Sequence, residues 1–313
     1  MSGHRLTTTT LGALLGLLIL GAAGYAYEPH VFSRVSQGAL VPRGFEGTDY
    51  YIYVPGAAHN DQPMTALVAL RGVGDDAEHF AASLVPAAEE NGWVLVVPHF
   101  IYGDWKKVET LKSEEETTLS WLDSLLGLLP DETSLQLRPR VLLYGFSRGA
   151  QAAHRFAFMY PRRVLAVASM SAGSYTLPTD RSPTLTPLEF PMGVGDLSRY
   201  CGQRFNLEAL RQVAFWVGVG EMDDSPDDVP RSFDQYIGSN RVERARNFAK
   251  ALQDHGVSVE LTIVPRLGHQ ESEASRRAAL TFLRALDIER NQQSTDAVKP
   301  QPSPTEKPPQ QAE

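Results

Sequence analysis

The chain has 313 residues, enough for one large α/β domain with appended segments or for two small domains. Its 42% hydrophobic content suits a protein with a sizeable core, and 29 Lys and Arg against 37 Asp and Glu give a net charge of −8. This acidic balance argues against a nucleic-acid partner, and the lone Cys201 excludes an intramolecular disulfide and a multi-cysteine metal site.

Residues 1–27 are predicted to lie outside the fold. The run from Leu11 to Ala26 is almost wholly apolar. It fits a secretory signal, with the small residues Gly24 and Ala26 preceding a cut before Tyr27. It also fits a retained membrane anchor, although it is slightly short of the ~20 residues that a spanning helix needs. We therefore expect an exported protein, either secreted or associated with the membrane or cell envelope through this segment.

Residues 28–44 are expected to be a linker, and residues 45–290 a single domain in which strands and helices alternate. Several of the strand-like runs are continuously apolar, as in strands that are covered on both faces. Such alternation predicts an α/β fold with a mostly parallel central sheet and helices on both faces. The predicted strands are Tyr50–Val54, Thr65–Leu70, Trp93–Pro98, Arg140–Gly145, Val164–Met170, Ala214–Val219 and Ser258–Val264.

Four helices have recognisable signals in the sequence. A capping box at Ser113–Glu116 predicts the start of one helix, which continues as a leucine stripe at helical spacing. The other three are expected at Ala150–Tyr160, Asn240–His255 and Glu271–Leu286.

Two long connections follow predicted strands, at residues 173–212 and 224–238. Ligands of open α/β sheets bind at the carboxyl ends of the strands, so both connections should border that crevice. We expect residues 173–212 to form a partial lid. Residues 291–313, rich in Pro and Gln, have no apolar periodicity and are predicted to be a disordered tail.

Ser147 is the candidate nucleophile. It lies in the frame Gly145-Phe146-Ser147-Arg148-Gly149, between a buried-strand pattern and a helix pattern. A strand that turns this sharply into a helix holds its middle residue in a strained conformation, with the hydroxyl clear of the sheet. The adjoining helix N-terminus favours developing negative charge.

A serine hydroxyl becomes an effective nucleophile when a base takes its proton, and that base needs an orienting acid. Asp223 and His269 each follow a predicted strand, in the chain order serine, acid, histidine. Strand ends bring distant residues to one edge of a sheet, which makes this agreement stronger than the serine motif alone. Asp224 is the next candidate for the acid.

The oxyanion-binding N–H groups are expected from Val73, in the loop Arg71-Gly72-Val73-Gly74, and from Arg148, directly after the nucleophile. The sequence assigns no role to Arg71. No dinucleotide, phosphate-loop or zinc motif is present, so no cofactor or metal is expected.

With these residues in place, the chain resembles the α/β-hydrolase superfamily, and within it the exported esterases of the polyhydroxybutyrate-depolymerase and feruloyl-esterase type. The resemblance rests on the serine motif, on Gly220-Glu221-Met222-Asp223, on Gly268-His269 and on the strand order. It implies a serine hydrolase that cleaves a small-molecule or lipid-like carboxylic ester through an acyl-enzyme. The early strand of that family usually ends in His-Gly, whereas this chain has Arg71-Gly72.

Three alternatives remain open at this point. A serine peptidase or an envelope acyltransferase would use the same fold and triad. A non-catalytic hydrolase-like domain would bind a cell-envelope partner instead.

Overall fold

The computed structural model describes residues 35–298, with side chains described through residue 292. The predicted signal or anchor at residues 1–27 lies outside the described residues, as do residues 299–313 of the predicted tail. The prediction of export therefore stays a prediction. No helix within the described range is both long and apolar enough to cross a membrane.

An eight-stranded sheet runs through the described domain in the order β1-β2-β4-β3-β5-β6-β7-β8. Strands β1 and β2 pair antiparallel with each other, as do β2 and β4, and all the other neighbours are parallel. The mostly parallel sheet predicted from the sequence is thus confirmed. The strands are β1 (Leu40–Phe45), β2 (Thr48–Tyr53), β3 (Ala66–Leu70), β4 (Val94–Pro98), β5 (Val141–Phe146), β6 (Val164–Met170), β7 (Ala214–Gly220) and β8 (Val259–Val264).

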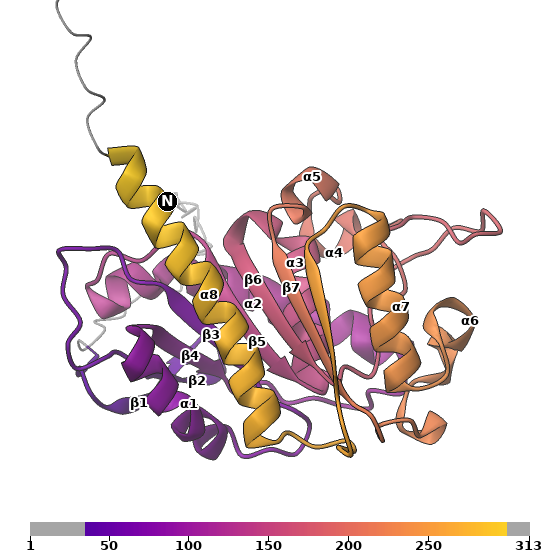
Figure 1. Ribbon diagram of the computed structural model, residues 1–313, viewed down its shortest axis with the longest axis horizontal. Coiled ribbons are helices and arrows are strands. Elements are labelled where there is room, and N and C mark those ends of the chain that lie inside the picture. The colour runs from indigo at the N-terminus through magenta and orange to yellow at the C-terminus, as the bar shows by residue number, and fades with distance from the viewer. Residues whose placement is uncertain (1–34, 299–313) are drawn as a thin grey trace, which may run out of the picture. The chain divides into compact units, whose positions relative to one another are not determined.

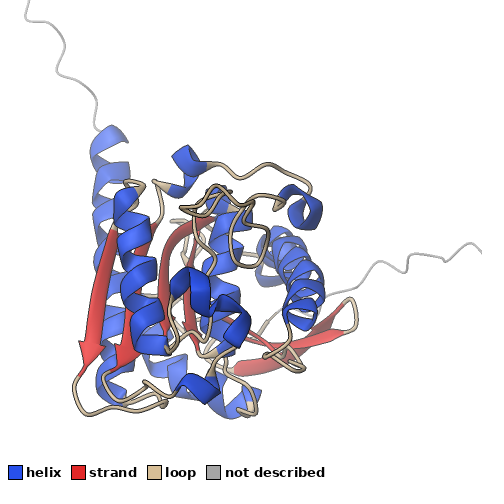
Figure 2. Ribbon diagram, turned by 90° about the vertical axis from the view of Figure 1, so that its right-hand side faces the viewer, coloured by secondary structure: helices blue, strands red, loops and turns tan. Residues whose placement is uncertain are grey.

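Helices cover both faces of the sheet (Figures 1 and 2). In Figure 1, α8 crosses the front of the sheet as the long yellow helix, with α1 beside it. The helices are α1 (Ala77–Asn91), α2 (Val108–Thr133), α3 (Arg148–Met159), α4 (Ser198–Cys201), α5 (Leu207–Leu210), α6 (Asp234–Ile237), α7 (Arg241–Asp254) and α8 (Glu273–Val298).

Each face of the sheet has its own apolar core, because successive side chains of a strand point to opposite faces. On β3, Val68 packs into the core formed with α2, α3 and α7, whereas Leu67 packs into the core formed with α1 and α8. Every residue of β3 is buried, as expected for a central strand covered on both sides.

Three expectations about element boundaries were wrong. Strand β1 (Leu40–Phe45) lies partly in the segment 28–44 that was expected to be a linker. Pro42 and Gly44 weaken its strand pattern, but an edge strand tolerates them. Helix α2 begins at Val108 rather than at the Ser113 capping box, and its N-cap, Lys107, makes no side-chain capping bond. Helix α8 continues to Val298, into the segment expected to be a disordered tail.

Residues 173–212 follow α3 along its length. Near the middle of α3, the Thr176 N–H donates to His154 Nε2 at 3.0 Å, and at its end the Gln203 side chain donates to the Met159 carbonyl at 2.9 Å. Residues 181–187 form a hairpin-like excursion closed by an antiparallel bridge between Arg181 and Pro187, and Leu185 within it is exposed. That this segment acts as a partial lid stays a prediction.

Helix α8 ties the last part of the described chain to the amino ends of two early strands. The Asp287 carboxylate accepts hydrogen bonds from the Thr65 hydroxyl at 2.6 Å and from the Trp93 indole N–H at 2.9 Å. All three side chains are buried. Because α8 starts just after the loop that carries His269, it runs from the carboxyl ends of the parallel strands to their amino ends.

His154 is held in the neutral form inside the core. Its Nδ1–H donates to the Ala150 carbonyl at 3.0 Å, and its Nε2 accepts from the Thr176 N–H at 3.0 Å. A second ring proton would face the Thr176 N–H. Burial, reinforced by the charge of neighbouring Arg155, lowers the pKa of His154 well below its ordinary value of 6.5.

This histidine should make the domain less stable in acid. As the pH falls below about 6.5, His154 binds a proton in the unfolded chain but stays neutral in the native state. The free energy of unfolding should then fall by up to about 1.4 kcal/mol per pH unit on account of this residue alone. Urea unfolding between pH 7 and pH 5 measures this pH dependence. The free energy of unfolding should change less per pH unit in H154Q than in the wild type. His59 is exposed, so H59Q serves as the control. An equal pH dependence of the free energy of unfolding in H154Q and the wild type would contradict the assignment of a neutral His154.

Candidate active site

The carboxyl ends of the parallel strands bring the predicted site residues to one edge of the sheet. Leu70 of β3 pairs with Gly145 of β5, and Gly220 of β7 pairs with Val264 of β8, so the loops after these strands start at similar heights. The residues carried by these loops and by the start of α3 are Val73, Ser147, Arg148, Asp223 and His269.

Ser147 joins β5 to α3 in a strained conformation, with φ 53° and ψ −114°. A non-glycine residue rarely adopts such a positive φ, and the surrounding structure must hold it there. Its N–H donates to the Met170 carbonyl of β6 at 2.9 Å. Gly149 lies so close to β3 that a Cβ on it would be 2.0 Å from the Leu70 carbonyl oxygen. The sharp turn predicted from the sequence is therefore present, and a glycine is required at its far end.

Ser147, His269 and Asp223 form a continuous hydrogen-bonded chain. Ser147 Oγ is 3.0 Å from His269 Nε2, and His269 Nδ1 is 2.8 Å from Asp223 Oδ2. This geometry places the Nδ1 proton on the aspartate side, which leaves Nε2 free to accept the serine proton. The His269 side chain is 31% exposed, and Asp223 is buried. A solvent-accessible serine and base above a buried acid is the arrangement needed to activate a hydroxyl.

Close packing of the loops after β7 and β8 positions the acid beside the histidine. The Asp223 N–H donates to the Gly220 carbonyl at 3.1 Å, and the Met222 N–H donates to the Leu267 carbonyl at 2.8 Å. A Cβ on Gly220 would be 2.2 Å from the Leu267 carbonyl oxygen. Asp224, the alternative acid, is exposed and bonds to neither the serine nor the histidine.

Two residues that contact the candidate triad were not assigned from the sequence. Arg241 is 4% exposed, and its guanidinium donates to Asp223 Oδ1 at 3.1 Å and to the Asp228 carbonyl at 2.6 Å. Phe146 stacks on the His269 ring with a centroid distance of 5.3 Å and an interplanar angle of 22°. Arg241 follows the N-cap of α7, and nothing in the local pattern distinguishes it from an exposed helical arginine. Phe146 belongs to the serine motif, so its proximity was available to sequence reasoning.

The loop after β3 lies directly beside the serine. A Cβ on Gly72 would be 3.5 Å from Ser147 Cβ, and the Gly72 N–H donates to Asp75 Oδ2 at 3.0 Å. The Val73 N–H, one predicted oxyanion donor, has no acceptor among the described residues. The other predicted donor, the Arg148 N–H, is the first of α3 and has no partner one turn earlier in the helix. Both groups remain available to a ligand.

The side chains of Arg71 and Arg148 converge on Tyr102. Their guanidinium carbons lie 6.0 Å and 4.9 Å, respectively, from the centroid of its ring. Arg148 also donates to the carboxylates of Glu114 and Glu115 on α2. Burial raises the pKa of Tyr102 to about 12, against the opposing effect of Arg148 and Arg71, so the phenol is neutral at pH 7.

A hollow of about 420 Å³ opens beside His269, between α1 and the loop that leads to α8. The residues that line it include three acidic ones, Asp75, Asp76 and Glu271. They include one arginine, Arg276. Arg276 is paired with Glu271. The hollow is therefore polar and carries excess negative charge.

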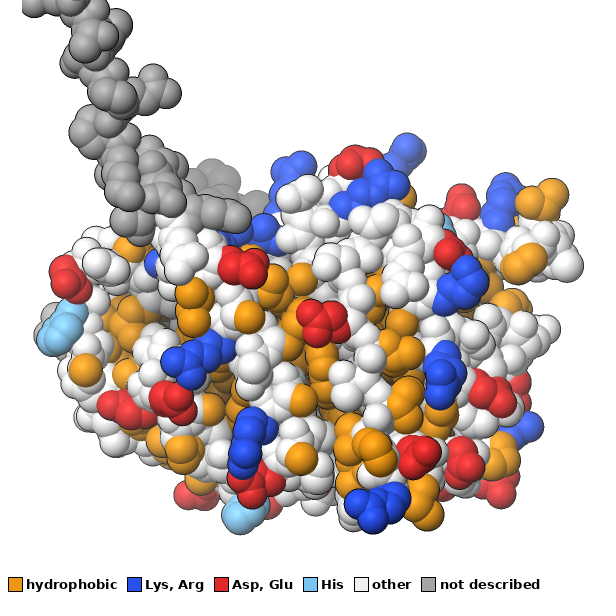
Figure 3. All heavy atoms as spheres, in the orientation of Figure 1, with side chains coloured by type: hydrophobic (Ala, Val, Ile, Leu, Met, Phe, Trp, Pro, Cys, Tyr) orange, Lys and Arg blue, Asp and Glu red, His pale blue; other side chains and the backbone are white. Residues whose placement is uncertain are grey.

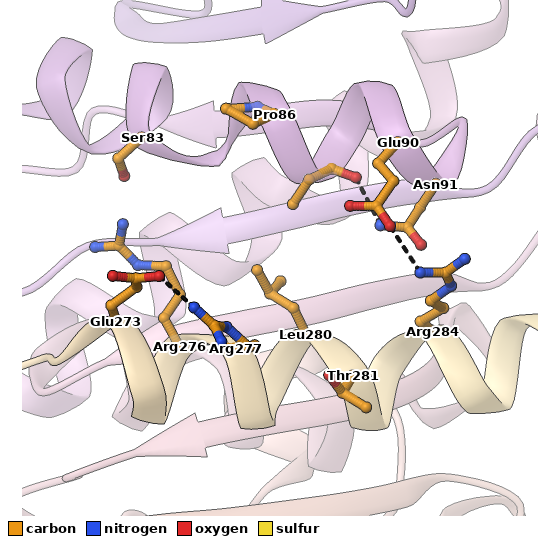
Figure 4. Close-up of a pocket in the computed structure, with 11 residues that line it drawn as sticks. Ser83, Pro86, Glu90, Asn91, Glu273, Arg276, Arg277, Leu280, Thr281 and Arg284 are labelled. Atoms are coloured by element: carbon orange, nitrogen blue, oxygen red, sulfur yellow. Dashed lines mark hydrogen bonds and ion pairs between the residues drawn. The ribbon is translucent and has the colours of Figure 1, made fainter.

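Ser83 and Arg276 also line a second groove of about 530 Å³, which continues from the hollow between α1 and α8. Figure 4 shows the ion pairs Glu273–Arg277 and Glu90–Arg284 along this groove. On the face drawn in Figure 3, acidic and basic side chains are interspersed rather than gathered into one basic patch.

Within residues 35–298, no group of three or more His, Cys, Asp or Glu side chains is arranged to hold a metal ion.

The two candidate acids are separable by substitution. D223N should lower kcat by roughly 10³- to 10⁴-fold, because an asparagine can hold the wrong histidine tautomer and cannot stabilise the imidazolium. D224N should change kcat by less than about twofold, since Asp224 does not contact the histidine. Steady-state hydrolysis of an activated ester measures both; equal losses in the two variants would contradict the assignment of Asp223.

Comparison with known proteins places this geometry in a familiar fold. No model of a protein family matches the sequence, and no curated protein sequence does. The structure is similar to poly(aspartic acid) hydrolase-1 from Sphingomonas sp. KT-1, with 17% identity, a TM-score of 0.61 and coverage of 78% of this chain and 98% of that chain. It is also similar to LpqC, a poly(3-hydroxybutyrate) depolymerase from Bordetella parapertussis, with 22% identity, a TM-score of 0.59 and coverage of 78% and 89%, respectively. The chain therefore has the α/β-hydrolase fold.

Proposed function

We propose that the protein is a serine hydrolase that cleaves carboxylic esters through an acyl-enzyme. The observation that carries the proposal is the chain of contacts from Ser147 through His269 to Asp223, with the serine on a strained turn. A Ser–His–Asp chain of this kind activates a hydroxyl for attack on a carbonyl carbon.

The reaction follows from these positions in two steps. Ser147 Oγ bonds to the ester carbonyl carbon as its proton passes to His269 Nε2, and the N–H groups of Val73 and Arg148 bind the oxyanion. The intermediate collapses, the alcohol leaves with the proton from His269, and the acyl group stays on Ser147. Water then gives a proton to His269 and attacks the acyl carbon, and collapse of the second intermediate releases the acid and restores Ser147.

Two of the solved structures with the same fold support an ester as the substrate. One of the two similar proteins above is named as a poly(3-hydroxybutyrate) depolymerase. A ferulic acid esterase shares the fold at a TM-score of 0.50 and 15% identity. Sequence identities this low make the esterase activity of this chain a proposal that rests on the geometry of its own triad.

A reactive alkyl phosphonate tests the nucleophile directly. The wild type should gain the mass of one phosphonyl group, because an assembled triad and oxyanion hole drive attack on the probe. S147A should gain none, and its ester hydrolysis should be lower by roughly 10⁴-fold or more. Intact-mass spectrometry and circular dichroism on both proteins give the result. A folded wild type that stays unlabelled and hydrolyses no ester would contradict the proposal and favour the binding-domain alternative.

The same preparation separates the two enzymatic alternatives. Turnover of peptide amides without ester turnover would identify a peptidase. Diversion of the acyl group to an added sugar or lipid alcohol at the expense of hydrolysis would identify an acyltransferase.

The hollow beside His269 supports a polar leaving alcohol. His269 protonates the departing oxygen, so the alcohol portion of the ester lies on the histidine side of the site. There it meets the carboxylates of Asp75, Asp76 and Glu271. Charged walls disfavour a long alkyl chain, and excess negative charge disfavours an anionic one. We therefore propose an alcohol group that is neutral and polar or cationic.

Acetate esters that differ in the charge of the alcohol test this charge preference. At low ionic strength, kcat/KM should fall in the order choline ester, neutral glycol ester, glycolate ester, and the spread should shrink in about 0.5 M salt as screening grows. D76N should reduce the differences in kcat/KM among the three esters, because asparagine retains the helix cap while removing one negative charge. D131N is the control, because Asp131 is an exposed residue of α2 that does not line the hollow. A glycolate ester preferred at low salt would contradict this charge preference.

A further inference from the structure

Arg71 binds two backbone carbonyl groups at the edge of the active site. Its Nη1 donates to the Gly72 carbonyl at 2.9 Å, and its Nη2 donates to the Phe100 carbonyl at 2.7 Å. The residue is only 6% exposed. One guanidinium thus ties the loop after β3 to the loop after β4. Two hydrogen bonds from a planar group to two fixed carbonyls leave the loop after β3 little freedom to rotate.

The carbonyl that Arg71 holds belongs to the peptide whose N–H is the predicted oxyanion donor. In a trans peptide, the C=O of Gly72 and the N–H of Val73 point in opposite directions in one plane. A guanidinium fixed on the carbonyl side therefore sets the direction of the N–H on the other side. Its positive charge also polarises the peptide, which strengthens the N–H as a donor.

The other side of Gly72 is fixed as well, because its own N–H donates to Asp75 Oδ2 at 3.0 Å. Gly72 packs against Ser147, with an ideal Cβ position 3.5 Å from Ser147 Cβ. The glycine is thus held between an acidic and a basic side chain on the wall of the site. Of these two contacts, the one from Arg71 acts on the donor peptide itself.

We propose that Arg71 is the positioning residue of the oxyanion hole: by binding the Gly72 carbonyl, it aims and polarises the Val73 N–H toward the tetrahedral intermediate. This inference rests on the proposed serine-hydrolase function. Arg71 does not touch the substrate, and its effect reaches the reaction through one peptide group. The contribution should therefore appear in the transition state and be nearly absent from substrate binding.

Replacement of Arg71 by methionine removes both hydrogen bonds while keeping an unbranched side chain of similar length. Loss of an oxyanion donor costs about 10²- to 10³-fold in kcat, so misdirection of one should cost roughly 10- to 100-fold, with KM within about twofold. The affinity for a boronic acid that forms a tetrahedral adduct on Ser147 should fall by the same factor as kcat/KM. R71K can bind only one of the two carbonyls well and should give an intermediate kcat.

Arg140 provides a matched control at the amino ends of the parallel strands. Arg140, half-buried, also holds two backbone carbonyls, those of Val164 and Gln212. R140M should be destabilised in thermal unfolding to a similar degree as R71M, yet keep its kcat and boronic acid affinity. In R71A, added guanidinium ion should occupy the space left by the arginine side chain and raise kcat. The same addition should leave the kcat of R140A unchanged.

The outcomes are distinct. A folded R71M with kcat and boronic acid affinity within about twofold of the wild type would overturn the positioning role. Equal losses of kcat in R71M and R140M would also overturn it, since both would then reflect general destabilisation. A wild type that neither hydrolyses esters nor reacts with the phosphonate would overturn the proposed function and this inference with it.

Discussion

The close contact between α3 and β3 is the constraint on which the site depends. Gly149 leaves no room for a side chain against the backbone of Leu70 and Arg71, and this contact fixes the turn that carries Ser147 beside the loop that carries Val73. The proposed nucleophile and one proposed oxyanion donor are thus held together by backbone packing rather than by flexible side chains. Such pre-organisation is what electrostatic catalysis requires, because donors that are already in place need no reorganisation during the reaction. The strain at Ser147 persists because packing on both sides determines its position.

Buried arginines provide a second layer of support around this constraint. Arg241 binds Asp223, Arg148 binds two glutamates of α2, and Arg71 binds the loop after β3. Each satisfies carboxylates or carbonyls that would otherwise be costly to bury. The guanidinium suits this task because several donors lie in one plane and can bind two acceptors at once. These buried contacts hold the elements beneath the candidate site together, whereas the His269 side chain is partly exposed to solvent.

The sequence predicts most of this architecture, because buried parallel strands are continuous apolar runs whose ends fall at one edge. That logic located Ser147, Asp223 and His269, and the structure brings all three into contact. It failed where the deciding interaction is remote in sequence or breaks a local rule. Strand β1 contains Pro42 and Gly44, which only its edge position allows. Arg71 bonds to the carbonyl of Phe100, 29 residues away, and Arg241 bonds to a carboxylate 18 residues away. No periodicity in the sequence marks such partners.

The path of α8 has a consequence for how the domain can be attached to something else. The helix starts beside the loop that carries His269 and ends past Asp287, which is bound at the opposite edge of the sheet to Thr65 and Trp93. In Figure 1 it runs away from the loops that follow the carboxyl ends of the parallel strands. A polypeptide or solid support joined after this helix would be attached on the far side from Ser147. The edge that carries Ser147 would then face outward, where even molecules too large to diffuse around the domain could reach it.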